Sequence, residues 1–103
     1  MKAATPYNRF LRRAATDKRL LPSHISLYTA MYYFYPLDSS DRFFKVSRRA
    51  LMRYSHIRSV ATYHKCVREL VAYGYLIYLP SYDPYKASII SLTIPTETRS
   101  IQL

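Results

Sequence analysis

Cysteine and glycine each occur only once in the 103-residue chain. The single cysteine, Cys66, cannot form a disulfide within the chain and offers no cluster of metal ligands, so we expect a reducing compartment and a metal-free fold. The single glycine, Gly74, excludes a glycine-rich loop that could cradle phosphate groups. Proline occurs six times, and this balance predicts long regular elements, mainly helices, joined by proline-marked turns.

Long hydrophobic runs are also missing from the chain. No stretch has the length or apolar purity of a membrane span, and residues 1–5 lack the apolar core of a secretion signal. We therefore expect no membrane partner and a cytoplasmic location.

Residues suited to catalysis are few and poorly placed. The six carboxylates form no pair that could share acid–base work. The histidines, His24, His56 and His64, are scattered and have no acidic partner at metal-ligand spacing. His64 and Cys66 stand two residues apart on an expected helix, point in nearly opposite directions and cannot pair. We predict no enzymatic activity, no catalytic or metal-binding residue and no cofactor, and no small-molecule ligand is indicated.

Positive charge is what the chain has in excess. Sixteen Lys and Arg residues against six Asp and Glu residues give a formal charge of +10, and so strong a field indicates an anionic polymer as the partner. The length suits one compact core. We divide the chain into a basic N-terminal segment at residues 1–22, a domain at residues 23–94 and a tail at residues 95–103. The N-terminal segment could be a short helix or an arm lying on the body.

A first helix is predicted at residues 25–35, with Ser23 as its cap and Pro36 at its end. Its apolar residues form two stripes, one of Leu27, Ala30, Met31 and Phe34 and one of Tyr28, Tyr32 and Tyr35. A surface helix would carry a single stripe. We therefore expect this helix to be central, with the tyrosine stripe either in the core or at a dimer face.

A second, short helix follows a possible strand at residues 43–46. Ser47 can cap this helix. Its apolar residues Ala50, Leu51 and Tyr54 should face inward, because they recur at helical spacing.

A third helix follows a tight turn at residues 55–58 and extends to residue 73. Ser59 caps it, and Gly74 ends it in a left-handed conformation. The residues at the spacing of one buried face are Tyr63, Cys66, Val67, Leu70 and Val71.

After Gly74 the spacing of the apolar residues changes from that of a helix to that of extended strands. Residues 75–79 and 87–94 are rich in aromatic and β-branched side chains and predict a β-hairpin around residues 80–86. Helix, short helix, turn, longer helix and hairpin is the order of a winged helix-turn-helix. We therefore predict an α+β fold, mainly α, with a three-helix core and a β-hairpin wing.

Basic residues concentrate on the second and third predicted helices. Residues 44–68 hold seven basic residues and no acidic one, whereas a solvated helix face usually mixes both signs. In a winged helix the third helix enters the major groove and the second crosses the DNA backbone. The residues predicted to face bases are Arg58, Ser59, Ala61, Thr62 and Lys65, with Glu69 on the same outward side. The residues predicted to face phosphates are Ser47, Arg48, Arg49, Arg53, Arg68, Tyr82 and Lys86.

Residues 57–70, together with residues 74–75 and 79–86, resemble a family of short winged helix-turn-helix proteins of bacterial mobile elements. The similarity extends back through residues 21–28 and 46–49. The resemblance implies a winged-helix fold and DNA binding, in proteins labelled transcriptional regulators and sometimes suspected of acting in element excision, transfer or replication control. Two positions depart from the pattern, because Ala87 stands where a glycine commonly follows the wing-tip lysine and Arg58 stands where a lysine is common.

The sequence thus predicts a nucleoid-associated, double-stranded DNA-binding protein, a transcriptional regulator or accessory factor of a mobile element. Residues 59–73 would read the major groove. Residues 24–35 or the N-terminal segment offer a face for a homodimer. The alternative is a winged-helix protein–protein interaction module without sequence-specific DNA binding, which would use Tyr28 and Tyr32. RNA binding is a third hypothesis.

Overall fold

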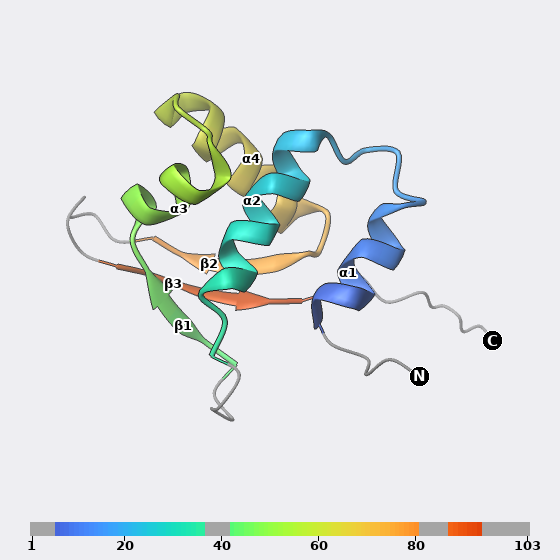
Figure 1. The fold of residues 1–103 in the computed structure, drawn as a ribbon, viewed down its shortest axis with the longest axis horizontal. Helices are drawn as coiled ribbons and strands as arrows, with labels where there is room; N and C mark the ends of the chain where they lie inside the picture. The colour runs from blue at the N-terminus through green and yellow to red at the C-terminus, as the bar shows by residue number, and fades with distance from the viewer. Residues whose placement is uncertain (1–5, 37–41, 81–86, 94–103) are drawn as a thin grey trace.

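Four helices and three strands lie within the described residues of the computed structural model, which are 6–36, 42–80 and 87–93 (Figure 1). The helices are α1 (Pro6–Ala14), α2 (Pro22–Tyr33), α3 (Arg48–Ser55) and α4 (Val60–Ala72). The strands are β1 (Phe44–Val46), β2 (Leu76–Leu79) and β3 (Ser88–Leu92). The predicted α+β class is confirmed, as are the short strand after the first predicted helix and the pairing of the two later strands.

The three strands form one antiparallel sheet in the order β1-β3-β2. Successive side chains of a strand point to opposite faces, and the register sets Phe44 opposite Ile90. Both of these residues are buried, whereas Lys45 and Ile77 on the opposite face are exposed. The sheet therefore closes the core with one face only.

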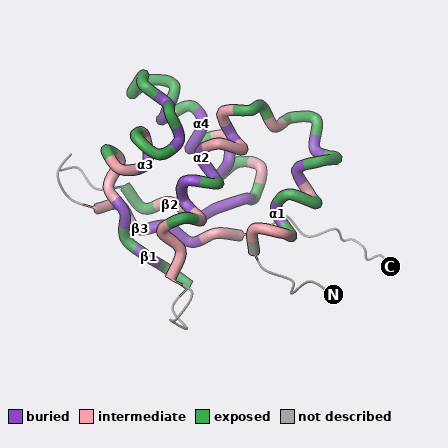
Figure 2. The backbone as a smooth tube through the Cα atoms, in the orientation of Figure 1, coloured by how far each residue is buried: buried purple, intermediate pink, exposed green. Residues whose placement is uncertain are grey.

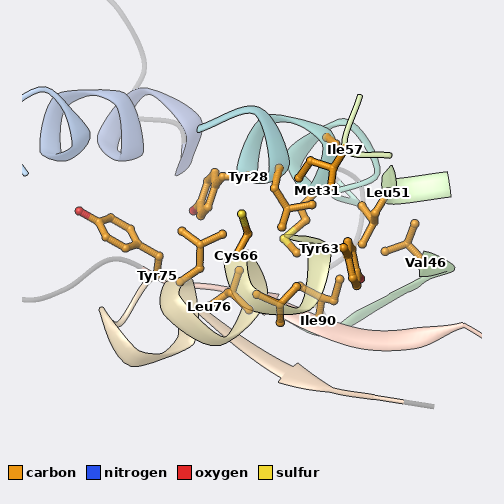
Figure 3. Close-up of a cluster of buried hydrophobic side chains, with 14 of the residues drawn as sticks. Tyr28, Met31, Val46, Leu51, Ile57, Tyr63, Cys66, Tyr75, Leu76 and Ile90 are labelled. Atoms are coloured by element: carbon orange, nitrogen blue, oxygen red, sulfur yellow. The ribbon is translucent and has the colours of Figure 1, made fainter. Parts of the chain in front are cut away.

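The core fills the space between the helices and this inner face. Figure 3 shows Tyr28 and Met31 of α2 facing Cys66 and Tyr63 of α4, with Ile90 on the sheet side. Tyr28, Met31, Tyr63 and Ile90 are fully buried. The buried stretches of backbone gather along this contact, as Figure 2 shows. Removal of this apolar surface from water is the main stabilising contribution.

Helix α1 belongs to the same core. Phe10 is fully buried, and its ring stacks on Tyr28 with the centroids 3.7 Å apart. Tyr7 stacks on Tyr32 at 5.2 Å. The core therefore contains four helices rather than the expected three. The sequence does contain the signal for this contribution, because Tyr7, Phe10, Leu11 and Ala14 recur at the spacing of one helix face, and the arginines around them drew attention to charge instead.

A buried carboxylate fastens the turn after α1 to the start of the hairpin. The side chain of Asp17 is 4% exposed and accepts hydrogen bonds from the Arg19 guanidinium, at 2.7 and 2.8 Å, and from the Tyr75 hydroxyl, at 2.7 Å. The hydrogen bonds from Arg19 lower the pKa of Asp17 well below its usual range, against the opposing effect of burial. Arg19 also lies over the Tyr73 ring, 4.2 Å from its centroid.

Helix α2 begins at Pro22 with Leu21 as its N-cap, so the prediction that Ser23 caps this helix is wrong. Proline suits the first helical position because its missing N–H has no partner there in any helix. The Leu21 N–H donates to Nδ1 of His24, at 2.8 Å. Ser23 lies inside the helix instead, where its hydroxyl accepts a hydrogen bond of 3.4 Å from the Cys66 thiol.

Helix α4 ends in a Schellman motif. Gly74 has φ 90°, the N–H of Tyr75 donates to the carbonyl of Leu70 at 2.9 Å, and the N–H of Gly74 donates to Val71 at 3.0 Å. The predicted left-handed glycine after the third helix is confirmed. These bonds reverse the chain so that β2 returns beneath the helix.

Two residues predicted to face inward are exposed. Tyr54 is 49% exposed and Val71 is 41% exposed. Both lie at the margin of their helix's buried face, whose centre is Leu51 in α3 and Val67 in α4, each nearly inaccessible. A single short helix gives too few apolar positions to locate the centre of its buried face, which is why the sequence misplaced them.

Two predicted features lie outside the described residues. They are the wing tip at residues 81–86, which includes Tyr82 and Lys86, and the tail at residues 95–103. Among the helices that the structure describes, none is both long enough and apolar enough to span a membrane.

Candidate nucleic-acid interface

The start of α3 carries the first group of predicted phosphate-facing residues. Ser47 is the N-cap, and its hydroxyl accepts the N–H of Ala50 at 3.1 Å, which confirms the predicted cap. Arg49 and Arg53 are exposed and Arg48 is half-buried. The first turn of α3 contains no acidic residue, so the positive end of the helix dipole is not neutralised locally.

Polar contacts hold the turn between α3 and α4. The Ser55 carbonyl accepts a short hydrogen bond from the Ser26 hydroxyl of α2, and the Ser55 hydroxyl accepts the N–H of Ile57 at 3.4 Å. His56 ends α3 in the left-handed conformation, with φ 63° and ψ 22°. Ile57 is buried and Arg58 is exposed. The turn is therefore tied to α2 and presents His56 and Arg58 to solvent.

Every residue that was predicted to face bases lies on the outward face of α4 or directly before that helix, where Arg58 and the cap Ser59 stand. Ser59 is the N-cap and accepts the N–H of Thr62 at 3.2 Å, as predicted. The exposed residues at and after the cap include Arg58, Ser59, Ala61, Thr62, Lys65 and Arg68. The first turn of this helix also lacks an acidic residue.

Hydrogen bonds connect the buried face of α4 to both strands of the hairpin. The Tyr63 and Tyr78 hydroxyls share a hydrogen bond of 3.1 Å, and Tyr78 shares another of 3.1 Å with the Ser88 hydroxyl. Burial, together with the bond to Tyr78, raises the pKa of the Tyr63 hydroxyl far above its usual range. Because the link uses hydroxyl groups alone, α4 and the hairpin are joined without an ion pair.

Glu69 was predicted to point outward with the base-facing residues, and the structure shows it half-buried instead, with 31% of its side chain exposed. Its carboxylate lies 2.7 Å from Nε2 of His24, whose side chain is 1% exposed. Nδ1 of His24 accepts from the Leu21 N–H, so Nε2 carries the proton and donates to Glu69. The sequence could not indicate this pair, because the partners are 45 residues apart.

This hydrogen bond directs the Glu69 carboxylate to His24 of α2, and 31% of the Glu69 side chain stays exposed. In the part of the chain that the structure describes, no carboxylate pairs with any basic residue of α3, α4 or the turn between them. The basic residues of this face are Arg48, Arg49, Arg53, Arg58, Lys65 and Arg68. Their positive charges are therefore available to an anionic partner.

An open hollow of about 560 Å³ lies beside the turn between α3 and α4. Its lining residues are Met52, Arg53, His56, Ile57 and Arg58. A neighbouring hollow of about 250 Å³ is lined by Arg53, Tyr54 and His56. Arg53 and His56 thus line both. The sequence did not single out His56 in this way, because nothing in the chain marks it as a helix C-cap.

The hairpin ends next to this basic face. In Figure 1, the ends of β2 and β3 that flank residues 81–86 lie on the same side of the molecule as α3, while α1 lies on the opposite side. Of the residues predicted to form the interface, only Tyr82 and Lys86 fall within that undescribed segment.

The tyrosine stripe predicted for the core or a dimer face is covered within the chain. Tyr28 is fully buried, and Tyr32 lies between Tyr7 and Tyr35, at ring distances of 5.2 and 5.6 Å. The surface proposed for the protein-interaction hypothesis, Tyr28 with Tyr32, is therefore occupied by α1. The aromatic residue of α2 that stays most exposed is Tyr33, at 65%.

The described residues contain no group of three or more His, Cys, Asp or Glu side chains that could hold a metal ion. Comparison with models of protein families, with curated proteins and with solved structures finds no match to this chain.

Proposed function

We propose that this chain is a winged helix-turn-helix protein that binds double-stranded DNA, with α4 in the major groove and α3 across the backbone. The observation that carries the proposal is the outward face of α4. The exposed residues Thr62 and Lys65 of this face, with Arg58 in the turn before the helix, can donate to base edges, and the small side chain of Ala61 permits close approach. The carboxylate on the same helix is held by His24.

Helix α3 and the hairpin would supply contacts to phosphates. Arg48, Arg49 and Arg53 come from α3, and Arg68 flanks them from α4. Contacts of this kind fix the position of the protein on the duplex and contribute affinity without sequence choice. Tyr82 and Lys86 would add contacts at the wing tip. We propose no catalytic step and no cofactor for this interface.

The biological role that fits this chemistry is that of a transcriptional regulator or accessory factor, associated with the nucleoid. A homodimer is part of the proposal, because a single module of this size buries little surface on DNA and many helix-turn-helix proteins read paired half-sites. Tyr33, which stacks on Tyr54 at 4.9 Å, is the exposed part of α2 that a second copy could contact.

The direct test passes a library of random-sequence duplex DNA over the immobilised protein at physiological salt and sequences the retained fraction. An inverted repeat would indicate a sequence-specific dimer, and a single short motif would indicate a monomer. Retention without any motif would indicate a protein that reads only phosphates. Absence of retention would overturn the proposal in favour of a protein-interaction module.

A charge reversal on α4 tests which surface binds. Lys65→Glu should lower duplex affinity by at least about tenfold, because it places a carboxylate beside base edges and phosphates. Lys18→Glu makes the same change in net charge at an exposed residue of the turn between α1 and α2, and should have a much smaller effect. Equal losses in the two variants would mean that only net charge matters and that α4 is not the reading helix.

A further inference from the structure

His56 occupies a backbone conformation that costs the fold free energy. It is the only residue other than glycine with a positive φ among residues 6–36, 42–80 and 87–93. A β-carbon is strained in this region, and glycine is not. The chain uses glycine at the equivalent place after α4, where Gly74 also has a positive φ. The presence of a histidine, rather than a glycine, at such a position indicates a function for its side chain.

The conformation of His56 places its side chain in the wall of both hollows next to the turn. Arg53 lines both hollows with it, and Arg58 lines the larger one. All three side chains are exposed, and within the described chain none of them pairs with a carboxylate. Two guanidinium groups and an imidazole N–H therefore meet at one concave surface, a set of donors that suits a phosphate group.

The remaining lining of the larger hollow is apolar. Met52 is half-buried and presents hydrocarbon surface to the hollow, whereas Ile57 is 7% exposed and contributes little surface. The turn beneath them is held by the hydrogen bonds of Ser55 to Ser26 and Ile57. A volume of about 560 Å³ lies within the usual range of small-molecule sites, roughly 300–1,000 Å³. This is larger than a lone phosphate requires and leaves room for a planar ring against the apolar lining.

We propose that this hollow binds a nucleotide, with the phosphate held by Arg53, His56 and Arg58 and the base lying against Met52. The nucleotide could be free in solution or part of a nucleic-acid strand, because both offer the same phosphate and base. The site's chemistry does not require that α4 bind duplex DNA, so the two proposals can fail separately.

The test is a titration of the full chain with dAMP at low salt, followed by amide chemical shifts and calorimetry, with inorganic phosphate as a second probe. The expected shifts are confined to the region of residues 52–58, with dAMP binding more tightly than phosphate. Arg53→Gln should weaken dAMP binding roughly tenfold, because it removes a charged donor. Arg12→Gln, the same change at an exposed residue of α1, lies outside both the hollow and the proposed DNA interface, and as the matched control it should leave dAMP binding unchanged.

His56→Gly gives the sharpest outcome, because two measured quantities should move in opposite directions. The midpoint of thermal unfolding should rise by roughly 4–8 °C as the strain is relieved, while dAMP binding weakens severalfold. Unchanged dAMP affinity in His56→Gly, or equal losses in Arg53→Gln and Arg12→Gln, would overturn the proposal.

Competition identifies the source of the nucleotide. Displacement of dAMP by a short duplex would mean that a DNA strand occupies the hollow. Simultaneous binding of dAMP and duplex would mean that the ligand is a free nucleotide. Binding of dAMP with no duplex affinity would support the hollow and overturn the proposed function, whereas the reverse result would overturn the hollow alone.

Discussion

Asp17 is a carboxylate with almost no exposed surface, and its hydrogen-bond partners determine whether that burial is tolerable. Arg19 donates to it through the backbone N–H at 3.1 Å and through the guanidinium, and Tyr75 donates through its hydroxyl. A buried charge without such partners would be strongly destabilising. With these partners the burial is tolerated. The ion pair of Asp17 with Arg19 lies within the turn after α1, and the hydrogen bond from Tyr75 joins that turn to the start of the hairpin.

Asp17→Asn should therefore reduce stability, and the reduction should depend on pH. The folded state lowers the pKa of Asp17, so the carboxylate contributes stability at pH values above its unfolded pKa, about 3.9. That contribution is lost as the pH falls below about 4 toward the lower, folded value. At neutral pH we expect a loss of about 2 kcal/mol.

Urea unfolding of both proteins at a series of pH values between neutral and strongly acidic checks this. The difference in unfolding free energy should shrink steadily below about pH 4. Lys18→Gln, a change of charge at the exposed neighbouring residue, is the control and should be nearly neutral at every pH. A difference for Asp17→Asn that stays constant down to strong acid would show that the carboxylate charge is not what stabilises the turn.

Helix ends are the features of single elements on which the proposed interface depends. Ser47 and Ser59 each cap a helix whose first turn has no acidic residue. Their hydroxyls are occupied by the N–H groups of Ala50 and Thr62, while other amides at each start have no partner within the helix. A cap and an anion-binding end can thus coexist at one position.

Two substitutions at Ser59 separate these roles. Ser59→Ala should cost about 1 kcal/mol of stability through loss of the cap and should affect duplex binding little. Ser59→Asp keeps a capping oxygen and suits the helix dipole, so stability should be preserved, while its charge should repel phosphates and lower duplex affinity at least about tenfold. Thermal unfolding and duplex titration of both variants measure the two quantities. Tight duplex binding by Ser59→Asp would exclude contact between this helix start and DNA.

Gly74 tests the other end of α4. Gly74→Ala should cost about 1–2 kcal/mol, because a β-carbon is disfavoured at φ 90°. Gly74→Asn should cost less, since asparagine tolerates left-handed conformations better than other residues with a β-carbon. Chemical unfolding of both variants gives the order, and equal losses would indicate that crowding beneath the turn, rather than backbone conformation, requires glycine.

The molecule as a whole is organised around α2. Helix α1 packs against one side of it through Phe10 and Tyr7, and α3 and α4 pack against other sides. Figure 1 shows α1 and α3 well separated, with α2 between them. The helices α3 and α4 that carry the proposed interface thus pack against α2, and α2 in turn packs against α1.

Loss of the contact between α1 and α2 should therefore lower the free energy of unfolding of the whole domain. Phe10→Ala should reduce stability by about 3–5 kcal/mol, because it removes a fully buried ring from the core. Leu11→Ala, at a neighbour that is 40% exposed, should cost below about 1 kcal/mol. Urea unfolding of the two variants checks the contrast. Similar small losses in both would mean that residues 6–14 are an appendage and not part of the core.

The sequence by itself determined the local features of this protein. The serine caps of α3 and α4, the glycine that ends α4, the strand pairing of the hairpin and the exposure of Arg58, Thr62 and Lys65 all follow from residue type and spacing within a few positions. These features depend on backbone conformation and periodicity, which neighbouring residues largely decide.

Only the tertiary structure decided what depends on residues far apart in the chain. The hydrogen bonds of His24 to Glu69 and of Tyr75 to Asp17 leave no periodic signal in either partner, and the stripes that contain Phe10 and Tyr28 do not show that these two rings stack on each other. The hollow at His56 likewise depends on how α3, the turn and α4 meet. Burial and electrostatic pairing depend on the folded surroundings of a residue. The basic helices could therefore be recognised from the sequence, whereas the contact that leaves Glu69 half-buried against His24 could not.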